Sequence, residues 1–227
     1  MARIGGVALT AGAAMLFAGA GRAVPPTIAL KVNAGSGRHA ISPYIYGLNF
    51  AKPGLAAATS LPVNRWGGNS TDTYNWKLGS SNTGLDYYFE NLSDCFLKSG
   101  RCTPAYRTFI SADRARRTET VLNLPMVGRV ARNAPRKHPV TCAFPVSVYM
   151  AQQSVDPYDT NCGNGKSRTG RPLSPKPARD SIAVGASFYR GWLHDLIRRY
   201  GTAAHGGVEF YELGNEPSLW NSTHRDM

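Results

Sequence analysis

The chain has 227 residues, of which 42% are hydrophobic and 10% aromatic, and its formal charge is +12. This apolar content excludes an intrinsically disordered chain, and the length fits one ordinary domain or part of a larger one.

A basic cluster between residues 114 and 137 raises the question of a nucleic-acid partner. No aromatic residues alternate with it, as binding of single strands would require. A solvated helix face followed by a polar loop explains it, so we expect no nucleic-acid partner.

The first 23 residues have the pattern of an export signal. Arg3 supplies a positive start, residues 5–20 are uncharged and mostly apolar, and small residues follow as far as Ala23. The alternative is a retained N-terminal anchor, but the run is short and rich in Gly and Ala, whereas a membrane span needs roughly 20 strongly apolar residues. We therefore expect a secreted or periplasmic protein with no membrane span after signal cleavage.

Extended segments and a loop are predicted next. Residues 27–32 alternate apolar and polar side chains like a half-buried strand, and residues 41–50 are a second extended candidate. Residues 61–66 are a short apolar strand that runs into a glycine-containing loop. The loop over residues 71–91 is long and holds five aromatic residues.

Helices and strands alternate in the rest of the chain. Apolar residues recur at helical spacing over residues 106–118 and more clearly over residues 182–200, where Gly201 follows as the C-cap. Strands are predicted at residues 120–127, 144–150 and 208–213, and residues 160–179 read as a polar loop.

This alternation favours parallel βα units over a sandwich. About four units fit into the chain, whereas a closed (β/α)₈ barrel has eight and typically ~250 residues. The sequence therefore predicts an α/β protein, with either a small open sheet or half of a barrel.

The four cysteines are Cys95, Cys102, Cys142 and Cys162, an even number that allows three pairings. Proximity in the sequence favours Cys95–Cys102 and Cys142–Cys162. Zinc is the alternative, but the chain has no C-x-x-C motif and no histidine at ligand spacing to a cysteine. An exported chain meets an oxidising compartment, which favours disulfides. We expect no cofactor and no catalytic metal. The sequence leaves open whether the protein binds a structural calcium ion.

Glu216 is the strongest candidate catalytic residue. It follows the predicted strand 208–213, and barrel enzymes place catalytic groups at the carboxyl ends of strands. Glycosidic cleavage needs a carboxyl group that protonates the departing oxygen. The neighbouring Asn215 amide can hydrogen-bond a sugar hydroxyl, and Trp220 offers a ring on which a sugar can stack. A solvated, inert glutamate in an ordinary loop is the alternative.

Four separated motifs support the catalytic interpretation. They are Asn64-Arg65-Trp66-Gly67-Gly68-Asn69, Tyr74-Asn75-Trp76, Asn123-Leu124-Pro125-Met126-Val127-Gly128, and Gly214-Asn215-Glu216-Pro217-Ser218-Leu219-Trp220 followed by Thr223-His224. In this order they resemble glycoside hydrolase family 44, bacterial endoglucanases and xyloglucanases that act on β-1,4-linked glucans. The resemblance runs from about Tyr46 to the last residue.

The resemblance implies a (β/α)₈ TIM-type barrel and a β-sandwich built from both chain ends. Residues 1–23 would be the signal peptide, residues 24–47 N-terminal strands that belong partly to the sandwich, and residues 48–227 the N-terminal half of the catalytic domain, about its first four βα units. The implied activity is retaining cleavage of internal β-1,4 linkages in a polysaccharide such as cellulose or xyloglucan. A non-catalytic carbohydrate-binding fragment is the alternative.

By resemblance, Glu216 is the general acid/base, and the nucleophile is a second glutamate on a later strand that this chain lacks. Retaining carboxyl groups lie about 5–5.5 Å apart, whereas Glu212 is four residues from Glu216, roughly 13 Å at ~3.3 Å per residue. We therefore expect this chain alone to be inactive. The family also leads us to expect Asp at position 214, where Gly removes a support. The residues predicted to bind substrate are Arg65, Trp66, Asn69, Tyr74, Trp76, Asn215, Trp220 and His224.

Overall fold

The computed structural model describes residues 28–227, which fall into two units divided after Ala40. The predicted signal peptide, residues 1–23, lies outside the described residues. In the first unit, the Asn33 side chain accepts a hydrogen bond from the Gly35 backbone at 3.0 Å and forms a turn. The strand predicted over residues 27–32 is wrong in its described part, because residues 28–32 are exposed and no strand within this unit pairs with them.

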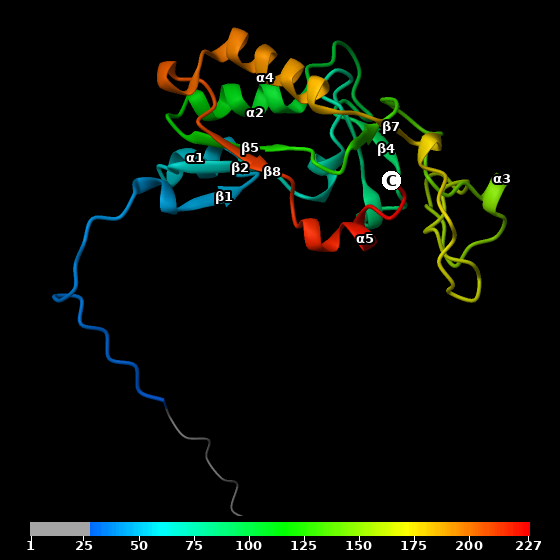
Figure 1. The fold of residues 1–227 in the computed structure, drawn as a ribbon, viewed down its shortest axis with the longest axis horizontal. Helices are drawn as coiled ribbons and strands as arrows, with labels where there is room; N and C mark the ends of the chain where they lie inside the picture. The colour runs from blue at the N-terminus through cyan, green and yellow to red at the C-terminus, as the bar shows by residue number, and fades with distance from the viewer. Residues whose placement is uncertain (1–27) are drawn as a thin grey trace, which may run out of the picture. The chain divides into compact units, whose positions relative to one another are not determined.

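A four-stranded parallel sheet forms the centre of the second unit, residues 41–227 (Figure 1). Its strand order is β1, β2, β5, β8, so the order in space follows the order in the chain. A (β/α)₈ barrel has this order, whereas a doubly wound sheet reverses direction. The strands are β1 (Gly47–Asn49), β2 (Val63–Trp66), β5 (Glu119–Leu124) and β8 (Phe210–Leu213).

Helices α1 (Pro53–Ala58), α2 (Ala105–Arg114) and α4 (Ala186–Tyr200) connect these strands, and α2 and α4 lie on the same side of the sheet (Figure 1). The predicted helices at 106–118 and 182–200 are thus confirmed, with shorter bounds. Helix α2 ends early because Arg117 adopts a left-handed backbone with φ 59°. Helix α4 begins late because β7 (Ser181–Ala183) pairs with β6 (Arg129–Ala131) just before it. None of the helices in residues 28–227 has the length and apolar character needed to cross a membrane.

The predicted loop at residues 71–91 contains regular structure. Strands β3 (Ser80–Asn82) and β4 (Asn91–Ser93) form an antiparallel hairpin. The remaining short elements are the 3₁₀ turns η1 (Pro43–Ile45), η2 (Asn69–Thr73), η3 (Gly84–Asp86), η4 (Pro177–Arg179), η5 (Ala203–His205) and η6 (Pro217–Leu219), and helices α3 (Val146–Tyr149) and α5 (Trp220–Thr223).

Helix α3 corrects the strand predicted over residues 144–150. The Tyr149 and Met150 amides donate to the carbonyls of Pro145 and Val146 at 2.9 and 2.8 Å, which closes one helical turn. This turn lies in an insert held by the Cys142–Cys162 disulfide, and Cys95–Cys102 forms the second bridge. Both predicted pairings are confirmed, and the zinc alternative is excluded for these four cysteines.

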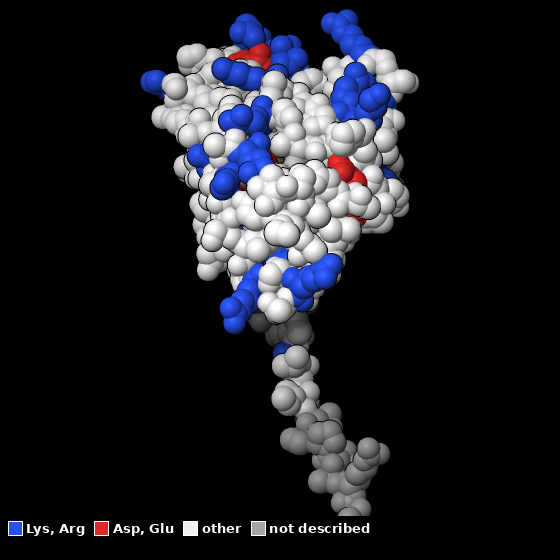
Figure 2. All heavy atoms as spheres, turned by 90° about the vertical axis from the view of Figure 1, so that its right-hand side faces the viewer, with Lys and Arg blue, Asp and Glu red and all other residues white. Residues whose placement is uncertain are grey.

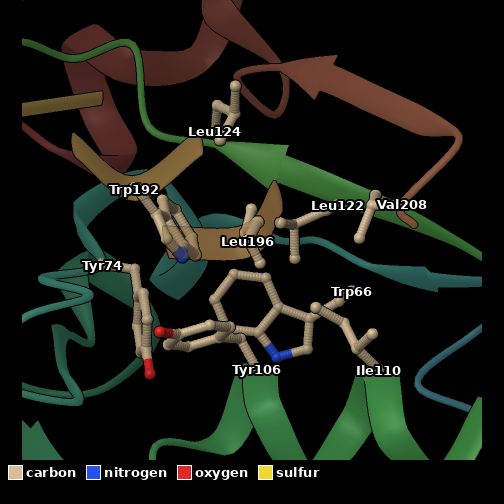
Figure 3. Close-up of a cluster of buried hydrophobic side chains, with 9 residues drawn as sticks. All are labelled: Trp66, Tyr74, Tyr106, Ile110, Leu122, Leu124, Trp192, Leu196 and Val208. Carbon is tan, nitrogen blue, oxygen red and sulfur yellow. The ribbon is translucent and has the colours of Figure 1, made fainter. Parts of the chain in front are cut away.

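An aromatic-rich core fills the space between the sheet and helices α2 and α4 (Figure 3). The Trp66 and Tyr74 rings meet edge to face at 4.7 Å, and their residues are only 4% and 1% exposed. The prediction that these two rings bind sugar directly is therefore wrong, because neither offers a free face. The core cluster consists of Trp66, Tyr74, Tyr106, Ile110, Leu122, Leu124, Trp192, Leu196 and Val208.

On the face that Figure 2 shows, Lys and Arg form separate groups divided by uncharged surface. Within the basic cluster noted in the sequence, Arg116 donates to the carbonyl of Pro53 at 3.1 Å and Arg129 to the Ser181 hydroxyl at 2.8 Å. These arginines tie local structure together in different places and do not form one stripe.

Candidate active site

Glu216 lies in the tight turn that follows β8. Gly214 has φ 77° and Glu216 has φ 44°, and Pro217 then begins η6. A Cβ atom at position 214 would lie 2.7 Å from Cζ2 of the Trp220 indole. The close approach and the left-handed backbone both call for glycine. Glycine here is thus a requirement of this turn, and the expectation that it removes a support is corrected.

The buried carboxylate of Asp72 fixes this turn from below. Its Oδ1 accepts hydrogen bonds from the Asn215 backbone N–H at 2.7 Å and from the Asn123 side-chain amide at 3.0 Å. Its Oδ2 accepts from the Trp220 indole N–H at 3.0 Å, and that indole also donates to the Asn215 carbonyl at 2.7 Å. Asp72 is fully buried. One carboxylate therefore holds the residues on both sides of Glu216.

Arg65, near the end of β2, binds the side chain of Asn215, whereas Asp72 binds its backbone. Its guanidinium donates to both carboxylate oxygens of Glu212 at 2.6 and 2.7 Å, and Nη2 also donates to Asn215 Oδ1 at 2.8 Å. The hydrogen bond to Glu212 raises the pKa of Arg65 above its ordinary value. Glu212 is thus occupied by an ion pair and serves as a support for this network.

The Asn215 amide nitrogen then points to two acceptors. It donates to Glu216 Oε2 at 3.2 Å and to Asn69 Oδ1 at 3.0 Å, and the Asn69 amide donates to the Asp86 carboxylate at 3.1 and 3.2 Å. Glu216 itself is exposed. The result is a solvent-facing carboxyl group on a braced turn, beside a row of amide and carboxylate groups, which can exchange protons with a bound substrate.

The structure brings five of the residues proposed for the site into one hydrogen-bond network: Arg65, Asn69, Asn215, Glu216 and Trp220. Trp76 lies elsewhere: its indole stacks on Trp192 at 6.5 Å and donates to the Phe188 carbonyl at 3.2 Å, so it covers the core beside α4.

His224 does not fit its predicted role in substrate binding, because its imidazole is buried. Nε2 lies 3.7 Å from Asp72 Oδ2, behind the site. The expectation that His224 lines a sugar subsite is wrong in this arrangement, because the ring has no access to a ligand.

Two pairs of buried acids lie outside this network. Burial, followed by the nearby Asp156 carboxylate, raises the pKa of Glu90 to about 8. Burial, followed by Asp226, raises the pKa of Asp180 to about 9. Within residues 28–227, no group of three or more His, Cys, Asp or Glu side chains is arranged to hold a metal ion.

Sequence reasoning did not identify Asp72, Asn123 and Asp86 as site residues. Asn123 stood inside a recognised motif, and a polar side chain within an apolar strand is a usable signal because buried polar groups need partners. Asp72 lay between two motifs, among five polar residues of η2 that look like a solvated loop.

Comparisons with known proteins agree with this geometry. The sequence profile of glycoside hydrolase family 44 matches residues 80–227. "Beta-mannanase/endoglucanase A" of Caldicellulosiruptor saccharolyticus is 30% identical over 209 residues, which cover 87% of this chain and 14% of that protein. "Endoglucanase A" of Paenibacillus lautus is 28% identical over 211 residues, which cover 87% of this chain and 27% of that protein.

Two solved structures share the fold. CelM2, a bifunctional glucanase-xylanase from a metagenome library, superposes with a TM-score of 0.77 and 37% identity, over 86% of this chain and 37% of that chain. A family 44 xyloglucanase of Paenibacillus polymyxa gives a TM-score of 0.52 and 25% identity, over 82% of this chain and 35% of that chain. The chain thus matches between 14% and 37% of the length of these four relatives.

Proposed function

Because the chain belongs to glycoside hydrolase family 44, we propose that it forms part of a retaining hydrolase that cleaves internal β-1,4 linkages of glucans such as cellulose or xyloglucan. The four parallel strands would be the first half of a (β/α)₈ barrel. The named activities of the relatives, endoglucanase, glucanase-xylanase and xyloglucanase, support a polysaccharide substrate. The export pattern in residues 1–23 and the two disulfides support secretion.

One observation carries the proposal: Glu216 is held at the carboxyl end of β8, next to the Asn215 amide at 3.2 Å. A general acid must reach the glycosidic oxygen while the sugar ring gains oxocarbenium character. An exposed carboxyl group on a turn fixed by Asp72 and Arg65 supplies that proton in a defined position. The Asn215 amide would bond a sugar hydroxyl beside it.

The second carboxylate of a retaining mechanism must come from outside this network. Glu212, the carboxylate nearest to Glu216 in sequence on β8, is bound at both oxygens by Arg65. We therefore expect the chain alone to bind glucan without cleaving it. Because both oxygens of Glu212 are bound by Arg65, Glu212 is not free to act as a nucleophile. This favours the second candidate function, a non-catalytic carbohydrate-binding protein.

The test compares two proteins on carboxymethylcellulose and xyloglucan. One is the 227-residue chain, and the other is a chimera in which the remaining part of the CelM2 domain completes it. The chimera should hydrolyse both polymers, and Glu216→Gln should lower its rate by about 10²–10⁴-fold, as loss of one general acid does. Glu209→Gln, also exposed and near β8, should leave the rate unchanged. Hydrolysis that survives Glu216→Gln would exclude Glu216 as the acid.

The stereochemical outcome can be read from the same reaction. A retaining enzyme releases the β-anomer first from a β-1,4 glucan, because two displacements restore the configuration. Proton NMR of the first products distinguishes this from inversion. An initial α-anomer would rule out the double displacement.

A further inference from the structure

A hollow of about 220 Å³ lies beside η3. Its walls come from residues 85–89, the end of η3 and the turn that follows it, from Ser154 inside the loop closed by Cys142–Cys162, and from Asn164 just after that loop. Two tyrosines of this wall meet edge to face at 5.0 Å, Tyr87 and Tyr88. The hollow therefore combines aromatic rings with a carboxylate, a hydroxyl and an amide, which are the groups that bind a neutral polyhydroxylated ring.

The hollow is linked to the candidate active site by adjacent polar side chains. Asp86 lines the hollow and accepts two hydrogen bonds from the Asn69 amide at 3.1 and 3.2 Å. Asn69 in turn accepts from the Asn215 amide at 3.0 Å, and Asn215 contacts Glu216. A ligand that extends from Glu216 along these side chains would reach Asp86 and then the tyrosines.

The aromatic wall is held in one geometry. The Tyr87 hydroxyl donates to Asp156 Oδ1 at 2.6 Å, while 37% of this residue remains exposed. Tyr88 and Phe89 both have left-handed backbones, with φ 45° and 53°. Bulky residues adopt this conformation only where the surroundings enforce it, and such positions cluster at ligand-binding sites.

The enforcing contacts are visible on the inner side of the turn. Phe89 is buried against Phe144, with ring centroids 5.0 Å apart, and the Phe89 N–H donates to the Gly84 carbonyl at 3.0 Å. The Thr83 hydroxyl donates to the Tyr87 carbonyl. With Phe89 anchored inward, Tyr87 and Tyr88 are presented on the wall of the hollow.

We propose that this hollow is a subsite for one pyranose unit of the glucan, at a distance from the bond that is cleaved. This proposal rests on the proposed function and names where the polymer runs. The apolar face of a sugar ring packs on a tyrosine ring, and its hydroxyls donate to the free lone pairs of Asp86. The volume lies below the ~300–1,000 Å³ of sites that enclose drug-sized ligands, so it takes a single ring of a longer chain.

The test measures binding of cellohexaose and of a xyloglucan oligosaccharide to the 227-residue chain by isothermal titration calorimetry. Tyr87→Ala and Tyr88→Ala should each raise the Kd by about 3–10-fold, the effect of one lost ring contact. Tyr87→Phe keeps the ring and should bind within about twofold of the native chain. Circular dichroism melting of each variant shows that the fold is retained.

Two controls separate the subsite from other sites. Tyr46→Ala removes an exposed tyrosine far from the hollow in the chain and should leave the Kd unchanged. Glu209→Gln, at an exposed position outside this row of polar side chains, should also leave the Kd unchanged. Tyrosine variants that bind like the native chain would overturn the subsite while leaving the proposed hydrolase intact.

A native chain that binds neither oligosaccharide would likewise overturn the subsite. The proposed function is decided separately by hydrolysis in the CelM2 chimera. If the chimera hydrolyses glucans and Tyr88→Ala leaves its KM unchanged, the proposed hydrolase function is supported and the proposed subsite is rejected.

Discussion

Arg65 and Glu212 form a two-point ion pair between strands that are not neighbours. Arg65 is on β2 and Glu212 on β8, with β5 between them, and the Nε–Oε2 distance is 2.6 Å. The same guanidinium bonds Asn215. The pair therefore ties the carboxyl ends of β2 and β8 together across β5, beside the residue that precedes the candidate acid.

Glu212→Gln should weaken this tie. The substitution keeps the size of the side chain but removes the charge and one of the two parallel acceptor contacts. Both partners are a little under one third exposed, so solvent screening reduces the loss to about 1–2 kcal/mol in the free energy of unfolding. Urea denaturation measures it, with Glu209→Gln as the exposed control. Equal stability of the two variants would show that the ion pair contributes nothing.

Asp72→Asn should cost more, although it changes only one atom. The new amide group places a donor where Asp72 now accepts from the Asn215 N–H or the Trp220 indole. Leaving such buried donors unpaired is expected to cost about 2–4 kcal/mol. Loss of the Asn215 amide's protection in hydrogen exchange would locate the effect in the Glu216 turn. A variant as stable as the native chain would contradict the anchoring role.

Stability should fall as the pH rises from about 4.5 to about 8, in part through Glu90, whose pKa changes between these values on folding. The folded chain keeps this proton where the unfolded chain has already lost it, so the unfolded state is favoured as the pH increases. One such group contributes at most about 1.4 kcal/mol per pH unit. Asp180, whose pKa burial and Asp226 raise to about 9, acts in the same direction.

Urea midpoints at several pH values for the native chain and for Glu90→Gln separate these contributions. The variant should show a shallower decline, because its side chain does not titrate. Glu209→Gln serves as the control and should keep the native slope. An unchanged slope in Glu90→Gln would mean that Glu90 titrates normally in the folded chain.

Trp66→Ala should unfold the domain rather than impair sugar binding selectively. The ring contacts Tyr74 and Trp192 in the core, at 4.7 and 6.2 Å. Truncating a buried aromatic side chain costs about 3–5 kcal/mol, a large part of the stability of an ordinary domain. Thermal unfolding measures the loss, and Tyr46→Ala should have little effect. A stable Trp66→Ala variant with weakened glucan binding would restore the direct role.

Strand alternation explains why only one of two adjacent motif residues reaches the site. Arg65 and Trp66 are neighbours on β2, so their side chains point to opposite faces of the sheet. Arg65 contacts Glu212 and Asn215, whereas Trp66 enters the core under the helices. A motif match alone assigns both residues to substrate, and the two-residue period of a strand separates them.

The alternation of parallel strands with helices, the two long helices, both disulfides and a glutamate just after a strand end could be predicted from local patterns. The role of Asp72 could not, because its partners Asn123 and Asn215 are 51 and 143 residues away in the chain. The helical turn of α3 was also not predicted, for a different reason. Its short apolar run fits a strand equally well, and only the backbone geometry after Pro145 distinguishes the two.

Arg225 connects Phe89 to the insert that contains Phe144 and Gly165. Its guanidinium lies over the rings of Phe89 and Phe144, at 5.0 and 4.6 Å, and donates to the Gly165 carbonyl at 2.7 Å. Gly165 has φ 71°, and a Cβ there would lie 2.1 Å from Arg225 Nη2. The backbone of the insert therefore packs directly against the Arg225 side chain.

Arg225 lies two residues after the end of α5, and α5 follows the turn that carries Glu216. Opening the insert would therefore release the end of α5, and fraying of α5 would release the insert. The two should exchange their amide protons as one cooperative unit. A surface insert that is remote in sequence would then set how often the turn that carries Glu216 loosens.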